Sequence, residues 1–188
     1  MKKSIIGASL AMAFGLMAGN AFAADNTGTI TFNGELTDTT CKVDIEGQGP
    51  DATITLPTVS TATLTAAGQV TGRTGFNMNL SDCKVGDAGH SKVSAFFETG
   101  ATVDQAAGRL NNMDISAAGA KLVQLQLLDG SNAFAPIKIG NTSQVNATTY
   151  VQITDEKATL PYAVEYYAIG KTDAGKVTSS VVYTLQYK

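Results

Sequence analysis

The stretch Val181-Val182-Tyr183-Thr184-Leu185-Gln186-Tyr187 stands next to the C-terminal end of this 188-residue sequence, and all of its odd-numbered residues are apolar. Successive side chains of a β-strand point to opposite faces, so this spacing predicts a strand with one buried face. The same alternation occurs in residues 28–32, 76–80, 123–127 and 162–166. The sequence therefore predicts several half-buried strands.

Glycine-containing clusters that favour turns separate these segments, at residues 47–50, 72–75, 129–132 and 172–175. Short alternating strands with turn signals between them are typical of an antiparallel β-sandwich. Residues 101–120 lack the pattern, and we expect a short helix or a long loop there. The sequence is therefore assigned to the all-β class.

The first 23 residues have the pattern of a secretory signal peptide. Lys2 and Lys3 precede an apolar run at residues 5–17, and small residues end in Ala21-Phe22-Ala23. A membrane anchor is the alternative, but the run of about 13 residues is shorter than the roughly 20 of a spanning helix. We expect cleavage before Ala24.

Removal of this segment leaves 11 basic against 16 acidic residues. Mild acidity with scattered lysines argues against nucleic-acid binding, because phosphate neutralisation requires a basic patch. No later segment reaches spanning length, so we expect no membrane insertion of the mature chain.

Cys41 and Cys83 are expected to form a disulfide, because an exported chain folds in an oxidising compartment. A catalytic thiol would need a base, and the single histidine, His90, follows a glycine-rich turn. Asp155 and Glu156 adjoin a lysine and are interpreted as a solvated turn rather than as a glycosidase pair. We expect no enzymatic activity, metal ion or cofactor.

Two strand-like segments lie at the ends of the mature chain. Residues 28–32 follow the predicted cleavage site closely, and only Lys188 follows residues 181–187. The two segments could pair with each other or join one sheet. Alternatively, the last strand borders an open groove and the first belongs to another molecule.

The order of these motifs resembles the pilins of chaperone–usher fimbriae, and especially the type 1 fimbrial major subunits. The resemblance covers essentially the whole mature chain. It is carried by residues 28–36 with Cys41 five residues later, by residues 75–83, 123–129 and 160–168, and by the penultimate Tyr187.

This resemblance implies an incomplete immunoglobulin-like β-sandwich that lacks its last strand, with an apolar groove beside the C-terminal strand. Pilins fill the groove by donor-strand complementation, a known form of strand addition. Residues 24–33 would be the donor extension and residues 34–188 the pilin domain. Ile30 and Phe32 would point into a neighbour's groove, and Gly28 would be a position kept small.

At the other end, the resemblance implies that four side chains face the core or line the groove: Val181, Tyr183, Leu185 and Tyr187. The terminal carboxylate of Lys188 would be gripped by a periplasmic chaperone. Further implied partners are identical or related subunits and an outer-membrane usher, with the product a fimbrium at the cell surface. A minor or tip-proximal subunit and a secreted carbohydrate-binding protein are the alternatives.

Overall fold

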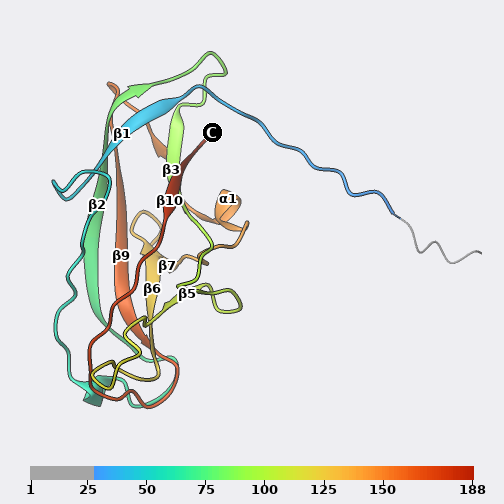
Figure 1. Cartoon of the computed structure of the whole chain (residues 1–188). Coiled ribbons are helices and arrows are strands. Elements are labelled where there is room, and N and C mark those ends of the chain that lie inside the picture. Colours follow the sequence, from blue (N-terminus) through green and yellow to red (C-terminus); the bar gives the residue numbers. More distant parts are fainter. Residues whose placement is uncertain (1–27) are drawn as a thin grey trace, which may run out of the picture. The chain divides into compact units, whose positions relative to one another are not determined.

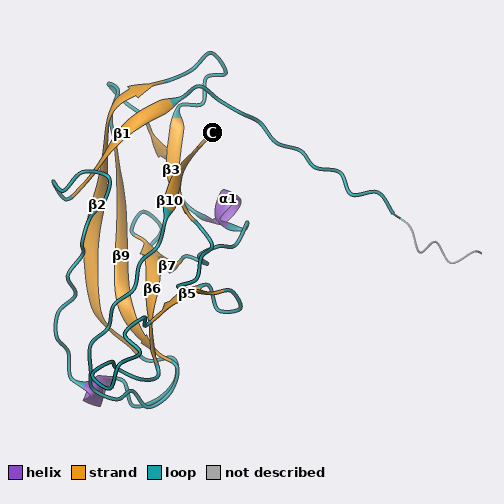
Figure 2. Ribbon diagram, in the orientation of Figure 1, coloured by secondary structure: helices purple, strands orange, loops and turns teal. Residues whose placement is uncertain are grey.

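The computed structural model describes residues 28–188, so the predicted signal peptide and residues 24–27 of the predicted extension lie outside the described residues. Residues 36–188 form a compact unit made of two antiparallel sheets, drawn in Figures 1 and 2. Residues 28–35 form a separate part. Within residues 28–188, no helix has the length and apolar character needed to cross a membrane.

The larger sheet has six strands in a row and a seventh strand paired beside them. The row is β1 (Thr40–Ile45), β2 (Val70–Lys84), β9 (Ala158–Ala168), β6 (Val123–Asp129), β5 (Arg109–Asn111) and β4 (Val103–Asp104), and β7 (Ala135–Pro136) pairs with β6. The smaller sheet has the order β10 (Tyr183–Tyr187), β3 (Lys92–Phe97) and β8 (Val151–Gln152). The prediction of an all-β fold is confirmed.

The core lies between the two sheets. Tyr162 of β9 packs edge-on against Phe97 of β3, with ring centroids 5.1 Å apart, and its hydroxyl accepts a hydrogen bond from the Ala95 N–H of β3 at 2.9 Å. Burial raises the pKa of the Tyr162 hydroxyl. The alternating apolar residues of β2, β6 and β9 fill the rest of the core, as their sequence pattern predicts.

Two details of the sequence prediction are wrong, the turn at residues 72–75 and the position of the short helix. Residues 72–75 form no turn but continue β2, whose pairing with β9 shifts register between Thr71 and Thr74. Gly72 has φ +68°, and such a bulge places an extra residue in a strand without ending it. Residues 101–120 are mostly loop, one of the two expected alternatives, and contain the short strands β4 and β5, whereas the short helix α1 lies at Gln144–Ala147.

The edge of β3 that faces away from β10 is closed mainly by side chains. β8 pairs only with Lys92 and Val93, at one end of the strand. At the other end, the buried Gln144 side chain accepts a hydrogen bond from Phe97 N–H and donates one to Phe97 C=O, at 2.9 and 3.0 Å. The smaller sheet is thus blocked along this edge.

Candidate functional site

Strand β10 pairs with β3 alone, so its other edge is open within the described part of the chain. Lys188 and Lys92 exchange two main-chain hydrogen bonds of 2.8 Å, and Glu98 N–H donates to Val182 C=O at 2.8 Å. In an antiparallel pair only alternate residues bond to the partner strand. The main-chain N–H and C=O groups of the even-numbered residues of β10 therefore point toward β3. Those of the odd-numbered residues point toward the open side.

The open edge continues beyond β10 toward lower residue numbers. Lys176 exchanges main-chain hydrogen bonds with residues 118 and 120, Thr178 C=O accepts one from Met113 N–H, and Ser180 C=O accepts one from the Thr102 hydroxyl. These residues are all even-numbered, so the parity of β10 is preserved. The odd-numbered main-chain groups of residues 177–187 form one edge, which spans roughly 36 Å at about 3.3 Å per residue.

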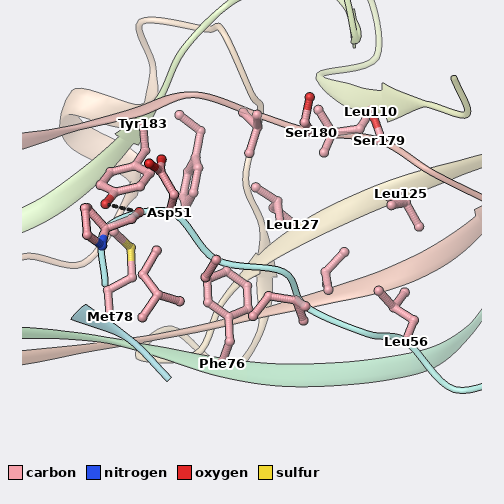
Figure 3. Close-up of a pocket in the computed structure, with 17 residues that line it drawn as sticks. Asp51, Leu56, Phe76, Met78, Leu110, Leu125, Leu127, Ser179, Ser180 and Tyr183 are labelled. Carbon is pink, nitrogen blue, oxygen red and sulfur yellow. Dashed lines mark hydrogen bonds between the residues drawn. The ribbon is translucent and has the colours of Figure 1, made fainter. Parts of the chain in front are cut away.

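An apolar groove runs beside this edge (Figure 3). One wall is residues 50–56 and the other is residues 179–183. The first cavity of the groove has a volume of about 340 Å³, and its floor comes from β2, β3, β5, β6 and β9. The apolar side chains that line it include Phe76, Met78, Phe97, Leu110, Leu125 and Leu127.

Two further cavities continue the groove along the same walls. A cavity of about 490 Å³ lies between residues 52–56 and 177–180, and one of about 610 Å³ adjoins residues 58–61 and 172–178. Neighbouring cavities share lining residues, among them Leu125 for the first pair and Tyr166 for the second. The groove therefore follows the open edge over much of its length.

Two tyrosine hydroxyls bond to the main chain of residues 50–57, one from β10 and one from β9. Tyr183 donates a hydrogen bond to Pro50 C=O at 2.9 Å (Figure 3), and Tyr166 donates one to Pro57 C=O at 3.3 Å. Burial, and secondarily the nearby Asp51 carboxylate, raise the pKa of Tyr183. These contacts hold residues 50–57 opposite the C-terminal strand, although those residues form no strand.

The residues predicted at the C-terminal end lie along this edge. Val181 and Tyr183 line the first cavity, and Leu185 and Tyr187 are partly buried against the core. Burial raises the pKa of Tyr187, and a hydrogen bond with the Cys41 main chain opposes the shift. The exposed Lys188 side chain donates to Val145 C=O at 2.8 Å.

The predicted donor residues 28–33 lie in the separate N-terminal part, residues 28–35. Residues 28–35 contain no strand, and Ile30 and Phe32 are 78% and 87% exposed. A Cβ atom placed on Gly28 would meet no atom within 4 Å. Leu36, the first residue of the compact unit, is 98% exposed and shares the even-numbered parity of Ile30 and Phe32. Leu36 lies beyond the predicted extension, residues 24–33, and this shared parity was the one feature of the sequence that could have added it to the donor residues.

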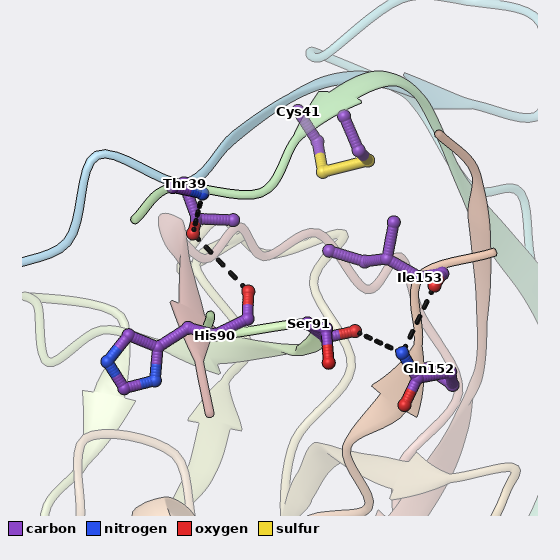
Figure 4. The surroundings of a disulfide bond; sticks show 8 residues. Thr39, Cys41, His90, Ser91, Gln152 and Ile153 are labelled. Atoms are coloured by element: carbon purple, nitrogen blue, oxygen red, sulfur yellow. Dashed lines mark hydrogen bonds between the residues drawn. A yellow bond between two sulfur atoms is a disulfide. The ribbon is translucent and has the colours of Figure 1, made fainter. Parts of the chain in front are cut away.

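The predicted disulfide joins Cys41 of β1 to Cys83 of β2, with an S–S distance of 2.06 Å (Figure 4), and this prediction is confirmed. The Thr39 hydroxyl beside it donates to His90 C=O at 3.3 Å, and His90 lies in a loop as expected. Asp155 is exposed in a tight turn. Residues 28–188 contain no group of three or more His, Cys, Asp or Glu side chains arranged to hold a metal ion.

The chain is similar to known proteins both in sequence and in fold. The sequence model of the type-1 fimbrial protein A family matches residues 56–188. The chain is 47% identical over 169 residues to the major fimbrial subunit SMF-1 of Stenotrophomonas maltophilia, which covers 89% of this chain and 95% of that protein. It is 40% identical to the F17 fimbrial protein of Escherichia coli, over 86% and 87% of the two chains. A subunit from a solved chaperone–usher pilus has the same fold, with a TM-score of 0.59 at 17% identity over 86% of this chain and 96% of that one.

Proposed function

Because the chain belongs to the type-1 fimbrial protein family, we propose that it is a structural subunit of a type 1-like fimbria and polymerises head to tail by donor-strand exchange. One observation carries this proposal: the main-chain edge of residues 177–187 is open beside an apolar groove. An unpaired edge is a template for another strand, because its N–H and C=O groups lack partners.

The N-terminal extension has the properties that such an edge requires. Residues 24–33 span roughly 33 Å when extended, which matches the edge in length. Ile30 and Phe32 are exposed, and each gains about 1.5–3 kcal/mol when it is fully buried. Leu36 carries the same apolar row further. We therefore assign residues 24–33 as the donor strand of the next subunit, with Gly28, Ile30 and Phe32 facing the groove.

The pairing of two different surfaces at each contact accounts for a filament. In the proposed assembly each chain contributes the groove beside residues 177–187 and the extension at residues 24–33, and these are different surfaces, so the contact between subunits is heterologous. A heterologous contact that does not close into a ring generates an open fibre. Such a fibre persists because a subunit whose groove is filled unfolds slowly, so the stability of the fibre is kinetic.

Before assembly, the groove requires another cover. We assign this role to a periplasmic chaperone that adds its own strand along Val181, Tyr183, Leu185 and Tyr187 and grips the terminal carboxylate of Lys188. An outer-membrane usher would then exchange the chaperone for the next subunit, and the surface fimbrium would support adhesion. Replacing Tyr187 with alanine should lower the periplasmic level of the subunit, and an unchanged level would contradict the chaperone assignment.

The test of polymerisation is a gel of sheared surface material in SDS, unheated beside boiled. The wild-type chain should give a high-mass ladder that collapses to one band on boiling. Phe32→Glu should abolish the ladder, because a carboxylate cannot enter an apolar groove. Thr31→Glu, which alters the opposite face of the same extension, is the matched control and should retain it.

A ladder from the Phe32→Glu chain would refute the donor assignment. The absence of a ladder from the wild-type chain would refute the polymer and favour a secreted single-domain protein. The abundance of the ladder separates a major subunit from a minor or tip-proximal one, because both would share the same groove and extension.

A further inference from the structure

The loop at residues 112–120 presents an exposed isoleucine to solvent. Ile115 is 87% exposed and, apart from Leu36, it is the most exposed large apolar side chain of residues 36–188. Met113 of the same loop is 45% exposed. A single exposed apolar side chain is ordinary on a protein surface, so its significance depends on how firmly it is held and on what lies next to it.

The Asn112 side chain holds this loop against the C-terminal segment. Its NH₂ group donates to the Ala120 and Lys176 carbonyls at 3.0 and 2.9 Å. Its oxygen accepts from the Asp114 and Thr178 N–H groups at 3.1 and 2.9 Å. The amide thereby uses both of its donors and both lone pairs of its oxygen.

Close packing of main chain on main chain adds to the rigidity of the loop. Lys176 N–H donates to Ala118 C=O at 2.8 Å, and Lys176 C=O accepts from Ala120 N–H at 2.9 Å. A Cβ atom at Gly175 would collide with the main chain of residues 118–120. Because the loop is already ordered, a contact made through Ile115 costs little conformational entropy.

The loop adjoins one end of the open edge. Met113 N–H donates to Thr178 C=O at 2.7 Å, so Ile115 lies two residues from a main-chain bond to the C-terminal segment. Ala120 lines the 610 Å³ cavity together with residues 172–178. The open edge ends at Val177 on this side, so a strand that follows the whole edge reaches the loop.

The direction of the added strand decides which part of the next subunit meets the loop. All the strand pairs of both sheets are antiparallel, and antiparallel pairing is the more stable per residue. An antiparallel donor begins beside Tyr187, and its last residue, 33, lies beside Val177. Leu36, the first residue of the compact unit, follows three residues later, a reach of roughly 10 Å at about 3.3 Å per residue.

The end of the compact unit that contains Leu36 has exposed apolar surface of its own. Thr40 at the start of β1 pairs with Lys84, and Val85, which follows β2 directly, is 45% exposed. The start of β1 and residues 172–175, which pack on the loop, lie at opposite ends of the unit (Figure 1). An antiparallel donor therefore brings the loop end of one subunit against the Leu36 end of the next.

We infer that the loop at residues 112–120 docks, through Ile115, on residues 36–39 and 84–90 of the next copy of this chain in the fibre. The inference rests on the proposed function and adds to it a contact outside the groove. Strand addition alone joins two compact units through a short connection, residues 34 and 35. A contact beside that connection limits how far the two units bend relative to each other.

The position of the contact is tested by photo-cross-linking in fibres of the full mature chain with Ile115→p-benzoylphenylalanine. Irradiated fibres boiled in SDS should give covalent multimers, and mass spectrometry should place the cross-links in residues 36–39 or 84–90. Val182, which is 70% exposed, is the matched control position and should give no cross-link to those residues. Cross-links from position 115 to any other part of the chain, no cross-link from it, or the same cross-links from position 182 would overturn the inference.

The mechanical role is tested by Ile115→Ser. Its fibres should keep the SDS-resistant ladder, because the groove is untouched, but should have a shorter persistence length in electron micrographs than wild-type fibres. The ratio of docked to undocked contacts should fall about ten-fold or more, the effect of one isoleucine that is no longer buried. Val182→Ser is the matched control and should leave the persistence length unchanged.

Two further results would overturn the inference. Ile115→Ser fibres as stiff as wild-type fibres would show that the loop makes no contact. In the Phe32→Glu chain, Ile115→Ser should leave unfolding in urea unchanged, and a loss of stability there would show that the side chain serves its own domain. Failure of the wild-type chain to give the ladder would instead refute the proposed function, so the two failures are distinguishable.

Discussion

Replacing Gln144 with leucine should lower the free energy of unfolding by about 2 kcal/mol. The Gln144 side chain is 1% exposed and pairs with both main-chain groups of Phe97. Phe97 C=O has a second partner in Gly140 N–H at 2.9 Å, whereas within the described part of the chain Phe97 N–H donates to the Gln144 side chain alone. The variant therefore leaves one buried N–H unpaired, which costs about 1–3 kcal/mol.

Leucine is similar to glutamine in size, so the change opens little cavity and the lost hydrogen bond dominates. Urea unfolding of the chain with Phe32→Glu, which should keep it monomeric, measures the loss. Gln152→Leu is the matched control, because the Gln152 side chain is exposed and donates only to the carbonyls of Ser91 and Ile153. We expect that control to cost at most about 0.5 kcal/mol.

If Gln144→Leu costs no more than Gln152→Leu, the Gln144 side chain does not hold the far edge of β3. The same substitution in a chain competent to polymerise should leave the SDS-resistant ladder in place, because the edge along residues 177–187 is untouched.

Three further predictions concern the stability of the same domain. Replacing Cys41 and Cys83 with alanine should lower the free energy of unfolding by about 4 kcal/mol, the chain-entropy value for a separation of 42 residues, as measured by urea titration. Burial raises the pKa of Tyr162 above its ordinary 10.0, so the folded state holds the proton more tightly than the unfolded state; stability should be retained below pH 10 and decline above it, which calorimetry at increasing pH would detect. Arg73→Met removes the ion-pair partner, at 2.9 Å, of the Glu165 carboxylate, which is 3% exposed, and should cost about 1–3 kcal/mol in the same titration.

Alternation in the sequence predicted the strands whose two faces differ, such as residues 76–80 within β2. It predicted β6 less completely, because both faces of that strand are buried. Gln124 and Gln126 look solvent-facing in the sequence, yet Arg109 covers the first with a 2.8 Å hydrogen bond and the second donates to Glu165. Burial of polar residues by partners distant in sequence leaves no local signal.

The sequence likewise predicts one part of the candidate site and not the other. The C-terminal wall of the groove was visible as a row of apolar residues of one parity. The opposite wall, residues 50–56, was not, because it has no strand pairing and is held by contacts such as that between Tyr183 and Pro50, which lie 133 residues apart.

If strand addition is confined to one place, as the proposed function requires, the other sheet edges of the subunit must be poor templates for an added strand. Within residues 28–188, the remaining edge strands are β1 with six residues and β4, β7 and β8 with two each, and short edges are poor templates. The exposed turn after β1 folds back on that strand, since Ile45 N–H donates to Gly49 C=O at 2.8 Å. Beyond β8, the edge of β3 is closed by the Gln144 side chain, which bonds to the N–H and C=O of Phe97 as the main chain of a neighbouring strand would. Among the described residues, the long edge along residues 177–187 is therefore the place where strand addition is least opposed, and in the proposed fibre one such edge per subunit would restrict growth to one dimension.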